Sequence, residues 1–203
     1  MKSSQQYHIT YVLMAINIAV YIYTSIAGGD ALHTSFDMIV QYGQVNGLVL
    51  GYGYYHQLFT SMFVHITIVH LAGNMLFLLI FGLRAEELFT LPEYLSIYFL
   101  GGLAGNLLSL AFMPPWIPSA GASGAIFAMF GACTIYIRRT VGQSIVGALI
   151  FAFFLLMISS GPEVNNLAHL GGLVAGLLIG YVLALRQKPE ATYTYNYSYT
   201  TPF

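Results

Sequence analysis

Six apolar segments separated by short polar stretches constrain this chain more than any other feature of its sequence. The segments are residues 11–27, 61–83, 94–113, 123–137, 144–158 and 167–185. A helix needs about 20 predominantly apolar residues to cross the hydrocarbon core of a bilayer. Of the 203 residues, 58% are hydrophobic and only 6% are charged, and a soluble domain of this size is not so poor in charge. The sequence therefore predicts an all-α, polytopic membrane protein that forms a single six-helix domain over residues 11–186.

The positions of the basic residues test this count of spans. Cytoplasmic loops of membrane proteins carry an excess of Lys and Arg. With six spans and a cytoplasmic N-terminus, every Lys and Arg of the chain falls on the cytoplasmic side: Lys2, Arg84, Arg138, Arg139, Arg186 and Lys188. A missing internal span would scatter them over both sides. We therefore expect a multi-pass protein of the cell membrane with cytoplasmic termini, the N-terminal one formed by residues 1–10.

Three segments carry expectations of their own. Residues 28–60 are too polar to span a membrane and too rich in Ile, Leu, Tyr and Phe to be a simple linker, which predicts a partly helical, interfacial outer loop. In residues 187–203 tyrosines alternate with Thr, Asn and Ser, which predicts a disordered cytoplasmic tail or, alternatively, strand pairing with a partner. The first span ends in Ser25-Ile26-Ala27, which would pass as a signal-peptidase site, but a single preceding lysine favours retention.

Charge and cysteine content exclude several classes of function. The formal net charge of -1 argues against a nucleic-acid partner, which would require a basic face. The single cysteine, Cys133, lies in the middle of a predicted span, where a packing role is expected rather than thiol or disulfide chemistry. We expect no metal ion and no organic cofactor.

The small, flexible stretch Gly121-Ala122-Ser123-Gly124 runs directly into the fourth span. Its glycines let other groups approach the Ser123 hydroxyl, and a helix N-terminus there favours a developing negative charge. Taken alone, the stretch is more simply an ordinary helix start with a serine cap. Arg138 lies about 22 Å of helix further on, so Ser123 is expected roughly 8 Å below the outer surface of the bilayer core. Non-helical backbone at that depth must line a cavity or be buried in protein.

Two histidines are predicted to share the depth of Ser123. With Arg186 and Arg84 taken as the cytoplasmic ends of their helices, His169 lies roughly 5 Å and His70 roughly 9 Å below the outer surface. Small residues, which allow close backbone contact, recur every fourth position on two spans: Gly124, Ala128 and Ala132 on the fourth, and Ala168, Gly172, Gly176 and Gly180 on the sixth. We therefore expect His169 to reach Ser123 and act as its base. No acidic residue lies at that depth, which predicts a Ser-His dyad.

The second span carries three further polar residues. His70 and Asn74 are four residues apart and share a helix face, so both can donate hydrogen bonds to an oxyanion beside the Ser123 backbone N–H. The alternative for this pair is a buried hydrogen bond between helices. His65 precedes His70 by five residues and would point about 140° away around a helix, which predicts a structural or loop-holding role.

These residues resemble the rhomboid family of intramembrane serine proteases over residues 10–186. The resemblance rests on His65-x4-His70-x3-Asn74, on Gly121-Ala122-Ser123-Gly124, and on Ala168-His169 followed by Gly172 and Gly176. It implies that Ser123 is the nucleophile, that His169 is the general base and acid, and that His70, Asn74 and the Ser123 amide form the oxyanion hole. It also implies that Glu86 helps to hold the start of a cytoplasmic loop, and that the fifth span with residues 159–166 forms a gate and cap.

Two positions depart from the family pattern. Where many relatives carry Trp-Arg in the first outer loop, this chain has His56-Gln57, so the bracing by the arginine is either replaced or lost. Where many carry a tyrosine that stacks on the catalytic histidine, this chain has Phe127, which keeps the stacking face and lacks only the hydroxyl.

The sequence thus predicts an intramembrane serine endopeptidase that cleaves transmembrane segments of membrane proteins near the outer leaflet. Local unwinding of the substrate is required, which predicts substrates with Gly, Pro or small residues near the cleaved bond. One alternative is a non-catalytic rhomboid-like protein that binds membrane proteins. Another is a metal transporter that uses His65, His70 and His169, which the lack of an intramembrane carboxylate and the 140° separation of His65 from His70 argue against.

Overall fold

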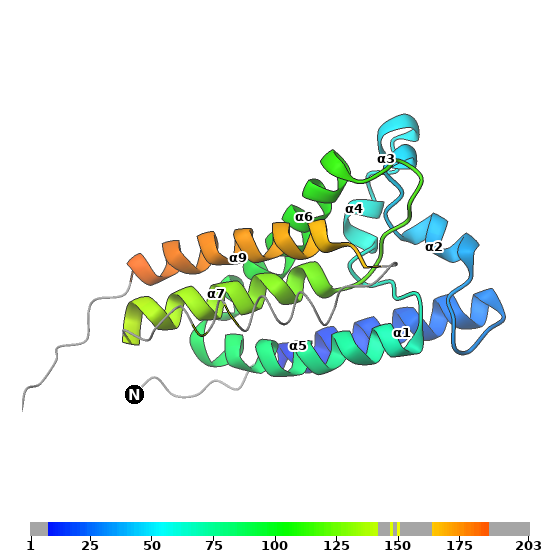
Figure 1. Ribbon diagram of the computed structural model, residues 1–203. Helices are drawn as coiled ribbons and strands as arrows, with labels where there is room; N and C mark the ends of the chain where they lie inside the picture. Colours follow the sequence, from blue (N-terminus) through cyan, green and yellow to red (C-terminus); the bar gives the residue numbers. More distant parts are fainter. Residues whose placement is uncertain (1–7, 142–146, 148–149, 151–163, 187–203) are drawn as a thin grey trace, which may run out of the picture.

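The structure, a computed structural model, describes residues 8–141, 147, 150 and 164–186. The helices in these residues are α1 (Ile9–Gly28), α2 (Phe36–Tyr42), α3 (Asn46–Tyr52), α4 (Gln57–Thr60), α5 (Ile68–Leu88), α6 (Leu91–Phe112), α7 (Ser123–Val141) and α9 (Asn166–Leu185). The β-structure of this part of the chain is limited to two isolated bridges. The predicted all-α bundle is therefore confirmed (Figure 1). The predicted tail, nearly all of the fifth span, and most of the predicted cap lie outside the described residues.

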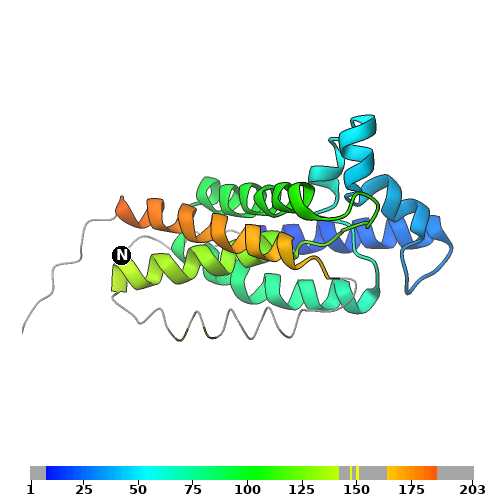
Figure 2. The ribbon, with the colours of Figure 1, turned by 45° about the horizontal axis from the view of Figure 1, so that its top comes forward.

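Four of the described helices are long and apolar enough to cross a membrane: α1, α5, α6 and α9. Helix α7 is not among these four, although it lies at the centre of the bundle and packs against α5, α6 and α9 (Figures 1 and 2). Every side chain from residue 124 to residue 133 is buried, Cys133 included. No side of this stretch faces lipid. It can therefore consist of small residues, which lower its mean hydropathy below that of a span exposed to lipid. The total of six spans stays a prediction.

The second span begins later than the sequence predicts. Helix α5 starts at Ile68, where the Thr67 side chain caps it by accepting a hydrogen bond from the His70 backbone N–H at 3.1 Å. The residues before it run along the loop that follows α1: the Thr34 N–H donates to the Ile66 carbonyl at 2.9 Å. These residues therefore pair with a distant segment instead of forming a helix. The predicted 140° separation of His65 from His70 around one helix is wrong for this reason.

The predicted outer loop, residues 28–60, is partly helical as expected and contains α2, α3 and α4. Helices α2 and α3 project beyond one end of the bundle (Figure 1). Large apolar side chains are exposed along this segment, among them Phe36, Leu50, Tyr52 and Tyr55. Such a surface suits a membrane interface, where aromatic rings concentrate, and the interfacial position stays a prediction.

The small residues of α7 and α9 meet in the register that their spacing predicts. A Cβ atom added to Gly172 would lie 2.0 Å from the Gly124 carbonyl oxygen, and one added to Gly176 would lie 2.0 Å from the Ala128 carbonyl oxygen. One turn further on, a Cβ at Gly180 would lie 2.5 Å from the carbonyl oxygen of Ala132. The two backbones are therefore in direct contact for three successive turns, and we call this contact the α7–α9 seam.

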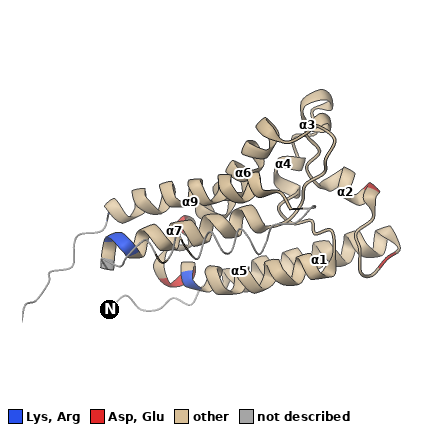
Figure 3. Ribbon diagram, in the orientation of Figure 1, with Lys and Arg blue, Asp and Glu red and all other residues tan. Residues whose placement is uncertain are grey.

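Charged residues are confined to the two ends of the bundle. The arginines of α5 and α7 lie at the same end, and α2 and α3 lie at the other (Figure 3). No Lys or Arg occurs between Lys2 and Arg84, so the described residues of the α2–α4 end carry no basic residue of either type. This distribution supports the predicted grouping of the cationic residues on one side of a membrane.

Candidate active site

Ser123 and His169 form a direct hydrogen bond. Ser123 is the first residue of α7, His169 lies in the first turn of α9, and the Ser123 Oγ atom is 2.8 Å from the His169 Nε2 atom. The contact was predicted from the depths of the two residues and from the spacing of the small residues on their helices. It joins a hydroxyl to a possible proton acceptor, which is the arrangement that a serine nucleophile requires.

The α7–α9 seam brings the helices of these two residues into contact close to both side chains. Gly124 directly follows Ser123, and Gly172 lies three residues after His169, so the first contact of the seam is within one turn of both side chains. Helices that touch through their backbones have little freedom to slide, because any shift along the seam brings main-chain atoms into collision. Both glycines are residues that the sequence predicts to allow close contact between these helices, and they lie next to the pair.

Phe127 and burial control the orientation of the His169 ring. The two rings are stacked at 22° with their centroids 4.6 Å apart, as the sequence predicts, and His169 is only 3% exposed. Among the described residues, the His169 Nδ1 atom has no hydrogen-bond partner. In the described residues, no acidic side chain bonds to the ring. The ring is held by its packing against Phe127 and by burial.

Gly121 brings His70 to the same place. Its φ angle is +129°, a backbone conformation that favours glycine, and an added Cβ atom would lie 2.9 Å from the His70 Nε2 atom and 3.7 Å from the Ser123 Oγ atom. The Gly121 N–H donates to the Ser61 carbonyl at 2.9 Å, which holds this backbone in position. A glycine is required here both by the backbone conformation and by the closeness of the His70 ring.

Asn74 lines the same cavity, one helical turn after His70. Its Nδ2 atom donates to the His70 carbonyl at 2.9 Å, which uses one of the two amide protons. The cavity has a volume of about 530 Å³, and its walls include Ser123, His169, His70 and Asn74 together with apolar side chains such as Phe77. The predicted nucleophile, base and oxyanion donors thus surround one space.

His65 lies in the loop before α5 and is fully buried. Its Nδ1 atom lies 3.2 Å from the Phe63 carbonyl, its own carbonyl accepts the Thr34 hydroxyl proton at 2.7 Å, and its ring contacts that of His70 edge-on at 5.2 Å. These contacts favour the predicted loop-holding role. The described residues contain no group of three or more His, Cys, Asp or Glu side chains that could hold a metal ion.

Glu86, which the resemblance implies holds the start of a cytoplasmic loop, does not lie at this site. It lies sixteen residues after His70 on α5, a helical distance of about 24 Å. Its Oε1 atom accepts the Thr10 backbone N–H at 2.6 Å, close to the start of α1. Glu86 therefore joins α1 to α5 at the far end of the bundle.

Gln57 braces the outer loop in place of the arginine that many relatives carry. Its Oε1 atom accepts the Val45 N–H at 2.9 Å, its Nε2 atom donates to the Val40 carbonyl at 2.7 Å, and it is fully buried. The neighbouring His56 contacts the Gln41 carbonyl through its Nε2 atom at 3.1 Å. The side-chain amide of Gln57 thus connects the end of α2 to the start of α3.

Two polar residues of the cavity wall, Asn106 and Asn165, are not among the site residues that the sequence predicts. Asn106 on α6 donates through Nδ2 to the Leu58 carbonyl at 2.8 Å and to the Ser61 hydroxyl at 3.0 Å, while its own carbonyl accepts from Gln44 at 2.9 Å. Asn165 joins the start of α9 to Ser119. A polar residue within an apolar span indicates a buried partner, and Asn106 lies within the third predicted span. Its role could therefore have been predicted. Asn165 lies outside the apolar segments, where no such pattern indicates a partner.

Comparison with known proteins gives matches to one family. The Rhomboid domain family model matches residues 52–186, which include Ser123 and His169. Rhomboid protease GluP of Bacillus subtilis is 32% identical over 182 residues, which are 87% of this chain and 35% of that protein. RHOMBOID-like protein 6, mitochondrial, of Arabidopsis thaliana is 35% identical over 65% of this chain and 45% of its own length. Rhomboid-like protease 3 of Toxoplasma gondii is 35% identical over 59% of this chain and 48% of its own length. The chain spans about a third to a half of the length of these relatives.

Proposed function

The chain belongs to the rhomboid family, and we propose that it is an intramembrane serine endopeptidase that cleaves transmembrane segments by a Ser-His dyad. The 2.8 Å hydrogen bond between the Ser123 Oγ atom and the His169 Nε2 atom carries the proposal. A half-buried serine and a buried histidine at the helix ends of a membrane bundle need a reason, since polar side chains there are costly. Covalent catalysis supplies that reason.

In the proposed reaction, Ser123 Oγ attacks the carbonyl carbon of the scissile peptide bond while His169 Nε2 takes the hydroxyl proton. To accept it, Nε2 must be unprotonated, which places the proton of the neutral ring on Nδ1. The tetrahedral intermediate collapses when His169 returns the proton to the leaving amine. Water then enters, gives a proton to His169 and attacks the acyl-enzyme, and Ser123 is regenerated with release of the new carboxyl terminus.

Three groups are proposed to stabilise the oxyanion. Ser123 is the first residue of α7, so its backbone N–H has no partner within the helix and lies at the positive end of the helix dipole. His70 lines the cavity beside Gly121, and Asn74 retains one amide proton after its bond to the His70 carbonyl. Donors fixed in a water-poor site stabilise a developing charge more strongly than the same donors would in water.

A dyad without an acidic third member needs another way to fix its base. The stacked Phe127 ring and the burial of His169 restrict the imidazole to one plane, which supports a dyad in place of a triad. The ring then carries its extra proton without a carboxylate beside it. We propose that the histidine is charged only while the oxyanion is present, when the two opposite charges stabilise each other.

The proposed partners are transmembrane proteins whose spans unwind readily. A helix hides its carbonyl groups in backbone hydrogen bonds, and the cavity of about 530 Å³ can accept only a short extended stretch of chain. Substrates are therefore proposed to carry Gly, Pro or small residues near the cleaved bond. The cationic residues at the opposite end of the bundle support a topology with cytoplasmic termini and a site toward the outer leaflet.

Cleavage of a single-span substrate by purified protein in lipid tests this proposal. Ser123→Ala and His169→Ala are each expected to lower kcat by roughly 10⁴-fold or more, because the members of such a pair act together. Ser96→Ala is the matched control, since this half-buried serine lies on α6 away from the cavity and its hydroxyl donates to the Pro92 carbonyl of its own helix. Cleavage that persists in Ser123→Ala would contradict the proposal. Absence of cleavage by folded wild-type protein across several substrates would favour a binding role instead.

A further inference from the structure

Asn165 links the two segments that carry the proposed catalytic pair. It is the N-cap residue of α9, where its Oδ1 atom accepts the Ala168 backbone N–H at 3.0 Å. Its Nδ2 atom donates to the Ser119 hydroxyl at 2.8 Å and also to the Ser109 hydroxyl on α6. The orientation of the amide follows from chemistry, since a backbone N–H can only donate and must face the amide oxygen. A single side chain therefore spans from the helix of His169 to the loop that leads into Ser123.

Ser119 is itself firmly held. Its backbone exchanges two hydrogen bonds with Gln44, one in each direction, at 2.7 Å and 2.9 Å. It lies four residues before Ser123, and Gly121, between them, is bonded to the Ser61 carbonyl. The loop at Ser119 is thus anchored to the outer loop, and Asn165 attaches the start of α9 to this anchored point.

We propose that Asn165 is a positioning residue that sets the distance between the Ser123 hydroxyl and the His169 ring. The inference rests on the proposed function of this pair. Helix α9 is fixed along its length by the α7–α9 seam, but its first turn lies before Gly172, where the seam begins. His169 is in that turn. Close packing of Gly105 against the Ala168 carbonyl holds this turn against α6. The amide bonds of Asn165 tie the start of the turn to the loop that leads into Ser123, and we call them the Asn165 clamp.

Suitable variants distinguish the two roles of Asn165, as the cap of α9 and as the clamp to Ser119. Asn165→Ser keeps a good N-cap residue but is too short to reach Ser119 at the same time. Ser119→Ala removes the other end of the clamp and leaves the cap intact. Asn165→Asp is the conservative variant: its carboxylate caps the helix and accepts a proton from the rotatable Ser119 hydroxyl, so it restores the link with the direction reversed.

Cleavage kinetics give the first readout. Asn165→Ser and Ser119→Ala are each expected to lower kcat by roughly 10- to 100-fold with little change in KM, because a displacement of about 1 Å at a reacting pair can have an effect of this size. The double variant is expected to be no slower than Asn165→Ser, since that substitution already breaks the link to Ser119. Asn165→Asp is expected to stay within about threefold of wild type. Ser96→Ala serves again as the control.

A readout that does not require cleavage keeps the two proposals distinguishable. The ¹⁵N signal of the His169 imidazole, assigned with His169→Gln, reports the hydrogen bond to Ser123 directly. It is expected to shift in Asn165→Ser and Ser119→Ala and to return in Asn165→Asp. If wild type cleaves nothing but these shifts occur, the clamp stands and the protease proposal fails. Unchanged shifts overturn the clamp, as does a loss of kcat in Asn165→Ser alone, which would mean that the effect runs through the bond to Ser109 or through contact with the substrate.

Discussion

Two pairs of neighbouring helices in this bundle are joined in opposite ways. At the α7–α9 seam, the closest neighbours of an added Cβ atom are main-chain oxygens, as at Gly172. Between α1 and α5 the contacts run through side chains instead: a Cβ atom on Gly82 would meet the Thr10 side chain at 2.8 Å, and Glu86 accepts the Thr10 N–H. Side chains can rotate away from an intruding atom, whereas two packed backbones cannot. Rigidity is therefore concentrated beside the proposed catalytic pair.

The strongest test of this contrast adds a single methyl group to each helix pair, by a glycine-to-alanine substitution. Gly172→Ala is expected to destabilise the fold by about 3 kcal/mol or more and to abolish cleavage, because the new Cβ atom would lie 2.0 Å from a carbonyl oxygen. Gly82→Ala is expected to have a smaller effect, about 2 kcal/mol, and to retain cleavage, since the buried Thr10 side chain and its hydrogen bond to Tyr94 must shift but no main-chain atom lies as close. Thermal unfolding and cleavage in the same detergent measure both.

The control for both variants is Gly51→Ala on α3, where nothing lies within 4 Å of an added Cβ atom. It is expected to change the free energy of unfolding by at most about 1 kcal/mol, in the stabilising direction, because alanine favours helix more than glycine does. Equal losses in Gly172→Ala and Gly82→Ala would show that the two helix pairs do not differ in rigidity, and the contrast would be lost.

Gly121→Ala is expected to damage activity more than stability. The new Cβ atom would lie 2.9 Å from the His70 ring and would displace it, with an expected fall in kcat of roughly 100-fold. Gly53→Ala is the matched control, because Gly53 also has a positive φ angle, +73°, while only the Tyr55 ring at 3.7 Å approaches it. Both variants carry a backbone strain of about 1–2 kcal/mol. Equal kcat values in the two variants would show that His70 takes no part in the reaction.

Removal of the Glu86 carboxylate tests the side-chain contact between α1 and α5. Glu86→Ala is expected to lower the free energy of unfolding by about 1 kcal/mol, since the Thr10 N–H loses its partner, and to leave kcat unchanged. Glu87→Ala is the control: Glu87 forms an exposed ion pair with Arg84, and such pairs contribute about 0–1 kcal/mol. Denaturation and cleavage assays measure these effects. A large fall in kcat in Glu86→Ala would mean that the far end of the bundle is coupled to the site.

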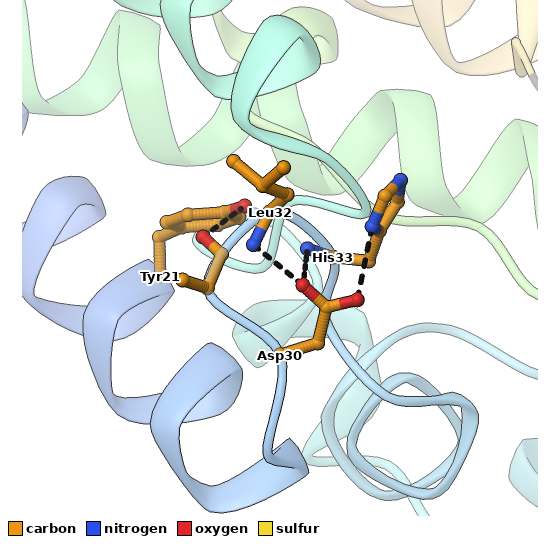
Figure 4. A network of polar contacts seen from close by, with 5 residues as sticks. Tyr21, Asp30, Leu32 and His33 are labelled. Carbon is orange, nitrogen blue, oxygen red and sulfur yellow. Dashed lines mark hydrogen bonds and ion pairs between the residues drawn. The ribbon is translucent and has the colours of Figure 1, made fainter.

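The smallest effect is expected in the turn after α1, drawn in Figure 4. The Asp30 carboxylate accepts the Leu32 N–H at 2.7 Å, the His33 N–H at 3.3 Å, and contacts the His33 ring at 3.1 Å. The Leu32 N–H first, and then the His33 side chain, hold the pKa of Asp30 below its ordinary value of 3.8.

Because the pKa is lower in the folded state, these bonds stabilise the turn at pH values above the unfolded pKa. This contribution is lost as the pH falls below 3.8 and through the folded pKa. Titration of the Asp30 carboxyl carbon by NMR measures it directly, with Asp30→Asn used for assignment. A midpoint at or above 3.8 would contradict the prediction, and cleavage at neutral pH is expected to be unchanged in Asp30→Asn.

The proposed catalytic pair could be found from the sequence because it depends on lengths along regular helices. A fixed rise per residue, measured from Arg138 and Arg186, placed Ser123 and His169 at similar depths, and the spacing of small residues selected which faces meet. The same rise places Glu86 about 24 Å along α5 from His70, at the opposite end of the bundle. What depends on helix geometry could be predicted.

The remaining features depend on contacts between distant segments, which periodicity does not reveal. Residues 61–67 are apolar enough to extend a helix, yet residues 61–63 form turns that continue α4, and the Ile66 carbonyl accepts the Thr34 N–H from the loop after α1. Asn165 looks like an ordinary loop residue until Ser119, forty-six positions earlier, lies beside it. The spatial arrangement of α2, α3 and α4 is fixed by buried amides such as that of Gln57. The partners of these amides cannot be inferred from their positions in the sequence.

Gln57 also determines how this outer loop responds to its surroundings. A guanidinium in the same position would carry a permanent positive charge, and its hold on the loop would vary with salt and with the headgroups of nearby lipids. The amide of Gln57 is neutral and makes its two bonds to the backbone without any counterion. The loop above the proposed site is therefore secured equally well in anionic and in zwitterionic membranes.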